Sequence, residues 1–321
     1  MRYVEVGGVR LSTIGLGTWQ FGSRAWGYGR DYADREAAAI VRRALELGVN
    51  LVDTAEIYAW GRSERIVGGA LRDVRERPFL ATKLYPAFPV APLVVRRGIA
   101  SARRLGVECI DLYQVHAQNP AVPIATTMRG MARLRRMGRI HHVGVSNFSR
   151  AQWRRAESAL GDAVLSNQVR YSLAVRAPER EVLPWAQDND RLVIAYSPLA
   201  QGLLSGAYGV DRVPRDVRAK NPLFRPDALT RATELLAALR SVAASHGASP
   251  AQVALAWLVR RPNVVAIPGA RTVAQLEANA AAADLRLSDD EDSLLTEVSD
   301  RFRSMATEPG RRDRLRRLLR R

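Results

Sequence analysis

The sequence predicts an α/β fold: a closed (β/α)8 TIM barrel with an N-terminal β-hairpin and a C-terminal helical extension. Eight short apolar runs alternate with amphipathic stretches along the 321 residues. Such alternation is typical of parallel strands joined by helices, and eight units favour a closed barrel over an open sheet. No Ser/Gly-rich linker divides the chain, so we expect a single barrel domain at residues 1–306, followed by an arginine-rich tail at 307–321.

A short hairpin is expected before the barrel. Two apolar stretches, residues 4–6 and 9–11, flank Gly7-Gly8, and a glycine pair suits a two-residue turn. The eight barrel strands that we expect are residues 14–17, 51–53, 79–83, 110–116, 140–146, 164–171, 192–197 and 264–268.

The segments between the strands repeat their apolar residues with a helical period. The expected helices are residues 34–47, 63–71, 92–105, 124–137, 150–160, 179–188, 230–245 and 251–259, with another after Thr272. Capping boxes are predicted at Ser249–Gln252 and Thr272–Gln275. Residues 201–227 have no regular period, and a loop of that length inside a compact domain is usually functional. We expect this segment to be a lid.

The charge balance is strongly basic, with 49 Lys and Arg against 32 Asp and Glu and a net charge of +17. Residues 301–321 hold nine arginines against Glu308 and Asp313, so much of the excess lies in the tail. Two explanations stay open for residues 311–321: an amphipathic basic helix that contacts an acidic surface, or a solvated terminus. We expect no nucleic-acid partner.

Nothing in the sequence indicates secretion or a membrane span. The first residues lack the apolar core of a signal peptide, and no run of about 18 apolar residues occurs. Cys109 is the only cysteine, and we expect it to be a buried thiol without a disulfide. His141, His142 and His246 lack partners at metal-binding spacing, so we assign no metal. We expect a cytoplasmic protein and leave the oligomeric state open.

Ionisable residues end three successive strands of the predicted barrel. Asp53 ends the second strand, with Tyr58 shortly after it, while Lys83 ends the third and His116 the fourth. Lys83 is notable because the chain has only two lysines, and lysine shifts its pKa readily beside a carboxylate or phenol. Each residue alone has an ordinary structural explanation. Since the carboxyl ends of barrel strands meet at one face, the four together predict a catalytic site.

Nine short segments form an ordered set along residues 4–283. They are GLGTW (15–19), DTAEIY (53–58), GRSE (61–64), ATK (81–83), IDLYQVH (110–116), GVSNF (144–148), SNQ (166–168), AYSPL (195–199) and IPGAR (267–271). This set resembles the aldo-keto reductase family, whose catalytic tetrad is matched by Asp53, Tyr58, Lys83 and His116. The resemblance implies an NADPH-dependent enzyme that reduces aldehydes or ketones to alcohols.

Reduction of a carbonyl group needs a hydride donor at carbon and a proton donor at oxygen. A free phenol has a pKa near 10 and is a poor acid at neutral pH. We expect Lys83 to lower the pKa of Tyr58, with Asp53 holding Lys83 charged and oriented, so that Tyr58 becomes the general acid. His116 would orient and polarise the carbonyl oxygen.

The family resemblance also implies which residues hold the nicotinamide cofactor. The carboxamide would form hydrogen bonds with Ser146, Asn147 and Gln168, and Tyr196 would stack on the nicotinamide ring. Arg271, at a helix start, would bind a ribose 2′-phosphate, which favours NADP(H) over NAD(H). The other expected contacts are Gly17, Thr18, Trp19, Ser197, Leu199, Gly202, Gly269, Gln275 and Asn279.

The expected substrate wall is aromatic and consists of Trp19, Trp26, Tyr28, Trp60 and Tyr85. Such a wall favours apolar or aromatic carbonyls. Ala117 follows His116 where many relatives have tryptophan, which predicts a wide pocket. Two other functions stay open: a cofactor-binding regulatory subunit resembling the potassium-channel β subunits, with slow turnover, and a reductase that its basic tail recruits to an acidic surface.

Overall fold

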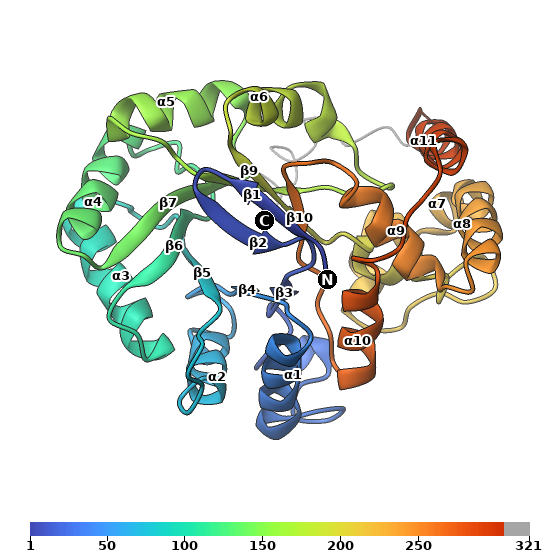
Figure 1. Ribbon diagram of the computed structural model, residues 1–321, viewed down its shortest axis with the longest axis horizontal. Coiled ribbons are helices and arrows are strands. Elements are labelled where there is room, and N and C mark those ends of the chain that lie inside the picture. The colour runs from blue at the N-terminus through green and yellow to red at the C-terminus, as the bar shows by residue number, and fades with distance from the viewer. Residues whose placement is uncertain (305–321) are drawn as a thin grey trace, which may run out of the picture.

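The computed structural model describes residues 1–304 and confirms the (β/α)8 fold (Figure 1). The eight-stranded sheet runs in chain order from β3 to β10 with parallel neighbours. Its strands are β3 (Leu16–Gly17), β4 (Leu51–Asp53), β5 (Phe79–Leu84), β6 (Ile110–Val115), β7 (Ile140–Ser146), β8 (Ser166–Arg170), β9 (Leu192–Tyr196) and β10 (Val264–Ala266). The predicted arginine-rich tail at 307–321 lies outside the described residues.

The barrel closes between its first and last strands. Gly17 forms a parallel bridge to Gly269, and the Gly15 N–H donates to the Ala266 carbonyl at 2.8 Å. A Cβ on Gly17 would lie 2.7 Å from the Ile267 carbonyl oxygen, so only glycine allows this approach. Neither Gly15 nor Gly17 has a positive φ, so these glycines do not form a tight turn. They let two strands meet.

Helices form the outer ring around the strands (Figure 1). They are α1 (Asp34–Glu46), α2 (Arg62–Ala70), α3 (Ala91–Leu105), α4 (Ile124–Arg136), α5 (Arg150–Leu160), α6 (Val182–Asp188), α7 (Pro226–Arg231), α8 (Thr233–Ser245), α9 (Pro250–Leu258), α10 (Val273–Ala281) and α11 (Asp289–Ser304). The helix expected at 179–188 is interrupted at Glu181, whose φ of −140° and ψ of −38° are not helical, so the 3-10 helix η2 (Ala177–Arg180) precedes it and α6 begins at Val182. The helix expected at 230–245 is two helices that meet at Ala232.

The N-terminal hairpin closes one end of the barrel. Strands β1 (Tyr3–Val6) and β2 (Val9–Ser12) pair antiparallel around two glycines with positive φ, and they cross the centre of the ring in Figure 1. Val4, Val6 and Leu11 join a buried cluster of strand residues from the barrel interior: Leu51, Ala81, Leu112, Leu165, Leu192, Ile194, Val265 and Ile267. Because the hairpin closes this end of the barrel, the other end, where the carboxyl ends of the strands lie, is open.

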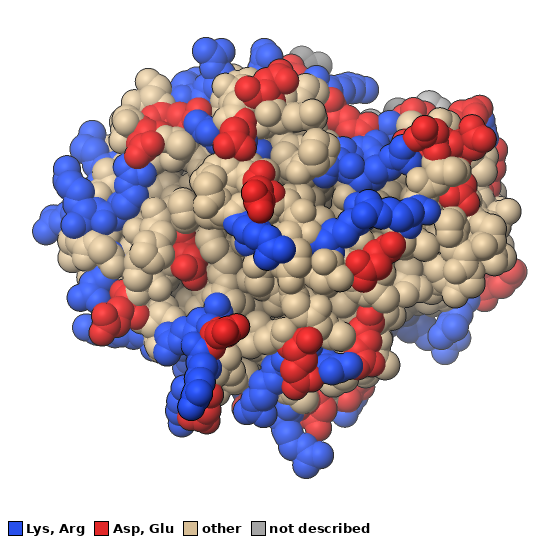
Figure 2. All heavy atoms as spheres, viewed as in Figure 1, with Lys and Arg blue, Asp and Glu red and all other residues tan. Residues whose placement is uncertain are grey.

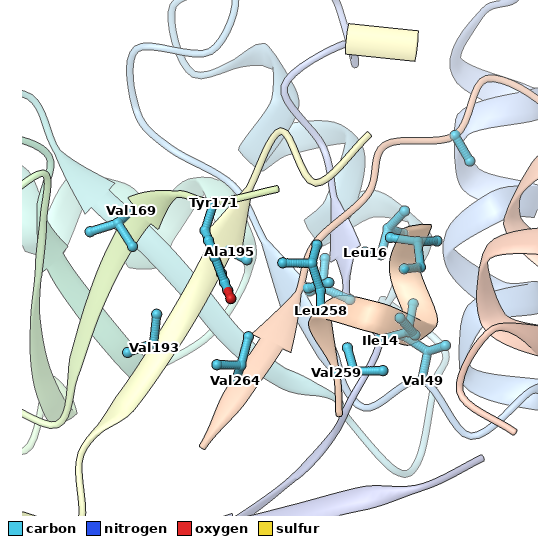
Figure 3. Close-up of a cluster of buried hydrophobic side chains, with 14 of the residues drawn as sticks. Ile14, Leu16, Val49, Val169, Tyr171, Val193, Ala195, Leu258, Val259 and Val264 are labelled. Carbon is cyan, nitrogen blue, oxygen red and sulfur yellow. The ribbon is translucent and has the colours of Figure 1, made fainter. Parts of the chain in front are cut away.

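A second apolar layer lies between the strands and the helices. Figure 3 shows Val193 on β9 and Val264 on β10 near Leu258 and Val259, at the end of α9. All four side chains are buried. Burying an aliphatic side chain of this size stabilises a fold by about 1.5–3 kcal/mol, so this layer holds the strands that support the open end.

Charged side chains of both signs are interspersed on the hairpin face of the molecule (Figure 2). Over residues 1–304, no helix is long and apolar enough to cross a membrane. Cys109 is half-buried just before β6, whereas the sequence analysis expected a buried strand thiol.

The segment 201–227 is not wholly irregular. It includes the 3-10 helices η3 (Ala200–Ser205), η4 (Val217–Lys220) and η5 (Pro222–Phe224). Phe224 meets Tyr208 of the same segment edge-on, with ring centroids 5.3 Å apart, and Phe224 is buried in the main apolar cluster of the barrel. Several of its residues line the cavity at the open end. The segment therefore forms one wall of that cavity.

Candidate functional site

A cavity of about 850 Å³ opens at the carboxyl ends of the strands. Asp53, Tyr58 and His116 line it, while Lys83 is fully buried beside Tyr58. All of the residues predicted to contact the cofactor also line it: Gly17, Thr18, Trp19, Ser146, Asn147, Gln168, Tyr196, Ser197, Leu199, Gly202, Gly269, Arg271, Gln275 and Asn279. Residues far apart in the sequence thus meet at one site.

Lys83 joins three polar groups in the floor of the cavity. Its Nζ donates to Asp53 Oδ1 at 2.5 Å, to the Thr54 carbonyl at 2.8 Å and to the Tyr58 hydroxyl at 3.1 Å. These bonds use all three N–H groups of the ammonium. The register of β4 and β5 sets Asp53 opposite Ala81, two residues before Lys83, so both charged side chains face the barrel interior.

Asp53 is buried, with 1 % of its surface exposed. Its second carboxylate oxygen accepts hydrogen bonds from Gln168 Nε2 at 2.7 Å and from Gln114 Nε2 at 3.3 Å. A buried carboxylate is tolerated only with an opposite charge and such donors. Gln168 was predicted only as a cofactor contact, and its hydrogen bond to Asp53 is a second role that the sequence does not reveal.

Burial has the largest effect on the pKa of the Tyr58 hydroxyl. It raises the pKa of the phenol, and the Lys83 ammonium opposes that rise without overcoming it. The expected lowering of the Tyr58 pKa is therefore wrong for the free protein, because loss of water disfavours the phenolate. Burial also works against the Lys83 ammonium, but Asp53 and Tyr58 outweigh it and raise the Lys83 pKa. At neutral pH the pair is a phenol beside an ammonium.

His116 faces Tyr58 across the floor of the cavity. The two rings meet edge-on, with centroids 6.1 Å apart. Burial, with a smaller contribution from Lys83, lowers the pKa of His116 to about 4, so its imidazole is neutral at pH 7. The buried Nδ1 atom has no hydrogen-bond partner within residues 1–304, which is uncommon for a buried polar atom and typical of functional sites.

Asn147 organises the polar wall at the end of β7. Its φ of +60° lies in the left-handed region, which asparagine tolerates better than most residues. Its Nδ2 donates to the His116 carbonyl and to Ser146 Oγ, while its Oδ1 accepts from the Tyr196 hydroxyl at 2.9 Å. Ser146 Oγ in turn donates to the Gln168 carbonyl. Three strand ends are linked through this one side chain.

Arg271 lies at the far end of the cavity, immediately before α10. Thr272 caps this helix by accepting from the Gln275 N–H at 3.1 Å. The Gln275 side chain accepts from the Arg271 N–H instead of from Thr272, so the predicted second capping box is only half formed. A Cβ on Gly269 would lie 2.7 Å from Gln20 Oε1, so the Gln20 side chain occupies the space that a larger residue at 269 would need.

Two aromatic residues predicted to line the substrate pocket do not. Trp60 is 82 % exposed, because Ala59 and Trp60 both have left-handed backbone angles that turn the indole into solvent. Tyr28 is buried against Tyr32, outside this cavity. Trp19, Trp26 and Tyr85 line the cavity as expected, and the rings of Trp19 and Trp26 meet at a tilt of 58° with centroids 5.1 Å apart.

Arg218 lines the cavity and was missed by sequence reasoning. Its guanidinium lies 4.8 Å from the Trp26 ring centre and 5.8 Å from that of Tyr208, and its Nε donates to the Gln201 carbonyl. It therefore joins the segment 201–227 to the aromatic wall and adds a positive charge there. The only sequence feature that could have pointed to Arg218 is its position in the segment 201–227, which was predicted to be functional.

Comparisons with known proteins agree with this geometry. A model described as the Aldo/keto reductase family matches residues 13–300. An uncharacterized oxidoreductase of Mycobacterium tuberculosis is 52 % identical over 308 residues, covering 96 % of this chain and 95 % of the relative. Methylglyoxal reductase YeaE of Escherichia coli is 35 % identical over 290 residues, covering 90 % and 91 %.

A crystal structure provides the same match in three dimensions. An aldo/keto reductase from Klebsiella pneumoniae, in complex with NADP and acetate, superposes with a TM-score of 0.76 at 31 % identity, covering 92 % of this chain and 95 % of that chain. The fold, the cavity and these matches lead to one conclusion. The chain belongs to the aldo/keto reductase family and is an NAD(P)H-dependent oxidoreductase.

Proposed function

We propose that the protein reduces an aldehyde or ketone to an alcohol with NADPH, and that Tyr58 is the proton donor. The observation that carries this proposal is the Tyr58 hydroxyl at the cavity floor, 3.1 Å from the Lys83 ammonium. A proton donor must be protonated before the reaction and stabilised as its anion afterwards. Burial keeps Tyr58 a phenol, and Lys83 is positioned to stabilise the phenolate that forms.

The proposed roles of the other residues follow from their contacts. Asp53 and the Thr54 carbonyl hold Lys83 in place. His116, neutral at pH 7, would donate a hydrogen bond to the carbonyl oxygen as negative charge develops there. When bound, a reduced nicotinamide supplies the hydride to the carbonyl carbon.

The cavity residues fit a nicotinamide dinucleotide. Amide groups are available at one end, and at the other Arg271 stands beside the N-terminus of the nine-residue helix α10, a favourable place for phosphate. The side-chain nitrogen of Gln168 donates a hydrogen bond to Asp53, so the side-chain oxygen of Gln168 is left to accept from a carboxamide N–H. We propose that Asn147 and Ser146 complete this contact, that Tyr196 stacks on the ring, and that Arg271 binds the 2′-phosphate.

The cavity wall guides the choice of substrate. Trp19, Trp26 and Tyr85 provide an aromatic surface next to the polar floor, which favours small aldehydes and ketones with an apolar or aromatic part. The name of the Escherichia coli relative, methylglyoxal reductase, makes methylglyoxal a sensible first substrate beside benzaldehyde.

The experiment is a stopped assay of alcohol formation together with NADPH oxidation, using methylglyoxal and substituted benzaldehydes. The proposal predicts stoichiometric alcohol and NADP formation. Tight cofactor binding without alcohol formation from any carbonyl would contradict it and would favour the regulatory role of a cofactor-binding subunit.

A further inference from the structure

Arg271 already has an anionic partner within the protein. Its Nη1 lies 3.6 Å from Asp31 Oδ2. Both side chains are partly exposed, at 35 % for Arg271 and 40 % for Asp31. Asp31 belongs to the loop between β3 and α1, far from Arg271 in the sequence.

Asp31 makes further hydrogen bonds in this position. Arg30 donates to its carboxylate with Nε at 2.9 Å and Nη2 at 3.2 Å, and the Asp31 N–H donates to the Gly27 carbonyl at 2.7 Å. Gly27 has a φ of +86°, and a Cβ there would lie 2.1 Å from Asp31 Oδ2. The loop therefore needs glycine at 27 to let the carboxylate take its place next to Arg271.

Asp31 affects the two nicotinamide cofactors differently. A 2′-phosphate is an anion that would share Arg271 with Asp31 or displace it, and the two negative charges repel each other. A ribose 2′-hydroxyl brings no charge and leaves the ion pair intact. A carboxylate near this position can also accept a hydrogen bond from such a hydroxyl.

We propose that Asp31 is a positioning residue for Arg271 that limits the preference for NADPH over NADH. This inference rests on the proposed function, because it requires Arg271 to meet the 2′-phosphate. It predicts that the chain binds NADPH less tightly than its Arg271 would allow and keeps a useful affinity for NADH.

The test is the dissociation constant of each cofactor, measured without substrate by quenching of tryptophan fluorescence. Trp19 and Trp26 line the cavity and report occupancy. In Asp31→Asn, which keeps the side-chain shape, NADPH should bind about three- to tenfold more tightly, as expected for one partly exposed charge pair, and NADH should change less than about twofold. Asp31→Glu should retain the original ratio.

Asp34→Asn is the matched control. Asp34 carries the same charge at the start of α1 but pairs with Arg62 at 3.6 Å, not with Arg271. If Asp31→Asn tightens NADPH no more than Asp34→Asn does, or changes both cofactors equally, the inference is overturned. The same holds if Asp31→Asn keeps its full effect in an Arg271→Ala background.

Arg271→Ala alone separates this inference from the cofactor assignment. It should weaken NADPH much more than NADH. If it does so while Asp31→Asn has no selective effect, only the role of Asp31 fails. If Arg271→Ala weakens both cofactors equally, the proposed 2′-phosphate site itself is wrong.

Discussion

Gln168 donates a 2.7 Å hydrogen bond from its side-chain nitrogen to Asp53 Oδ2, which joins β8 to β4 across the barrel. An ionised carboxylate only accepts hydrogen bonds, so the amide must turn its nitrogen toward Asp53. Asp53 in turn accepts a hydrogen bond from Lys83, and Lys83 also donates one to the Tyr58 hydroxyl. The proposed cofactor contact and the proposed proton donor are therefore linked through two buried charges.

Replacing Gln168 with leucine should destabilise the fold. The change removes a donor from a buried carboxylate, and a hydrogen bond to a charged group is worth about 1.5–3 kcal/mol. Urea unfolding measures the difference from the wild type. Gln187→Leu, at an exposed position on α6, is the control and should stay within about 0.5 kcal/mol. Equal stability of the Gln168 variant and the wild type would contradict the importance of this bond.

Lys83→Met should cost far more stability, because it leaves Asp53 as a buried charge without a counter-charge. Breaking a buried pair in this way typically costs about 3–5 kcal/mol. The double variant Lys83→Met, Asp53→Asn removes both charges and should recover much of that loss. Chemical denaturation of the three proteins tests this. No recovery in the double variant would mean that packing, and not charge, causes the loss.

His116 should make the fold sensitive to acid. Its pKa in the folded state is about 4, mainly because of burial, against about 6.5 when exposed. The unfolded chain therefore takes up the proton first, and stability falls as pH drops from about 6.5 toward 4, by about 3 kcal/mol in total from this group. His116→Asn should lose less stability over this window. Parallel unfolding curves at pH 7 and pH 4.5 give the comparison.

Trp19 and Trp60 should respond differently to truncation. Trp19 lines the cavity, whereas Trp60 is exposed and outside it. Trp19→Ala should raise the KM for an aromatic aldehyde about tenfold, because the cavity wall loses an aromatic surface that the substrate would contact. Trp60→Ala should leave KM nearly unchanged. Equal effects in steady-state assays would mean that the substrate approaches from the Trp60 side.

Much of the barrel could be predicted because its signals are local. The bounds of β4, β7 and α5 match the predicted residues, since each is a short apolar or amphipathic run between clear turn residues. The four tetrad residues also follow from a local rule, as each stands at or just after a strand end. The structure brings Asp53, Tyr58, Lys83 and His116 together at the open end.

The features that the sequence could not predict depend on unmarked backbone angles or on contacts between distant segments. The exposure of Trp60 follows from two left-handed residues that no motif marks. The role of Gly17 requires the position of Ile267, and the raised pKa of Tyr58 requires its burial. The ion pair between Asp31 and Arg271 likewise exists only once the barrel has closed.

The most direct test of the central claim is the turnover of Tyr58→Phe compared with its affinity for NADPH. Loss of the proton donor should lower kcat by about 10²- to 10⁴-fold. The dissociation constant for NADPH should change less than about twofold, since the phenylalanine keeps the ring and its packing. If Tyr58→Phe retains wild-type turnover with methylglyoxal or benzaldehyde, Tyr58 is not the general acid and the proposed mechanism is wrong.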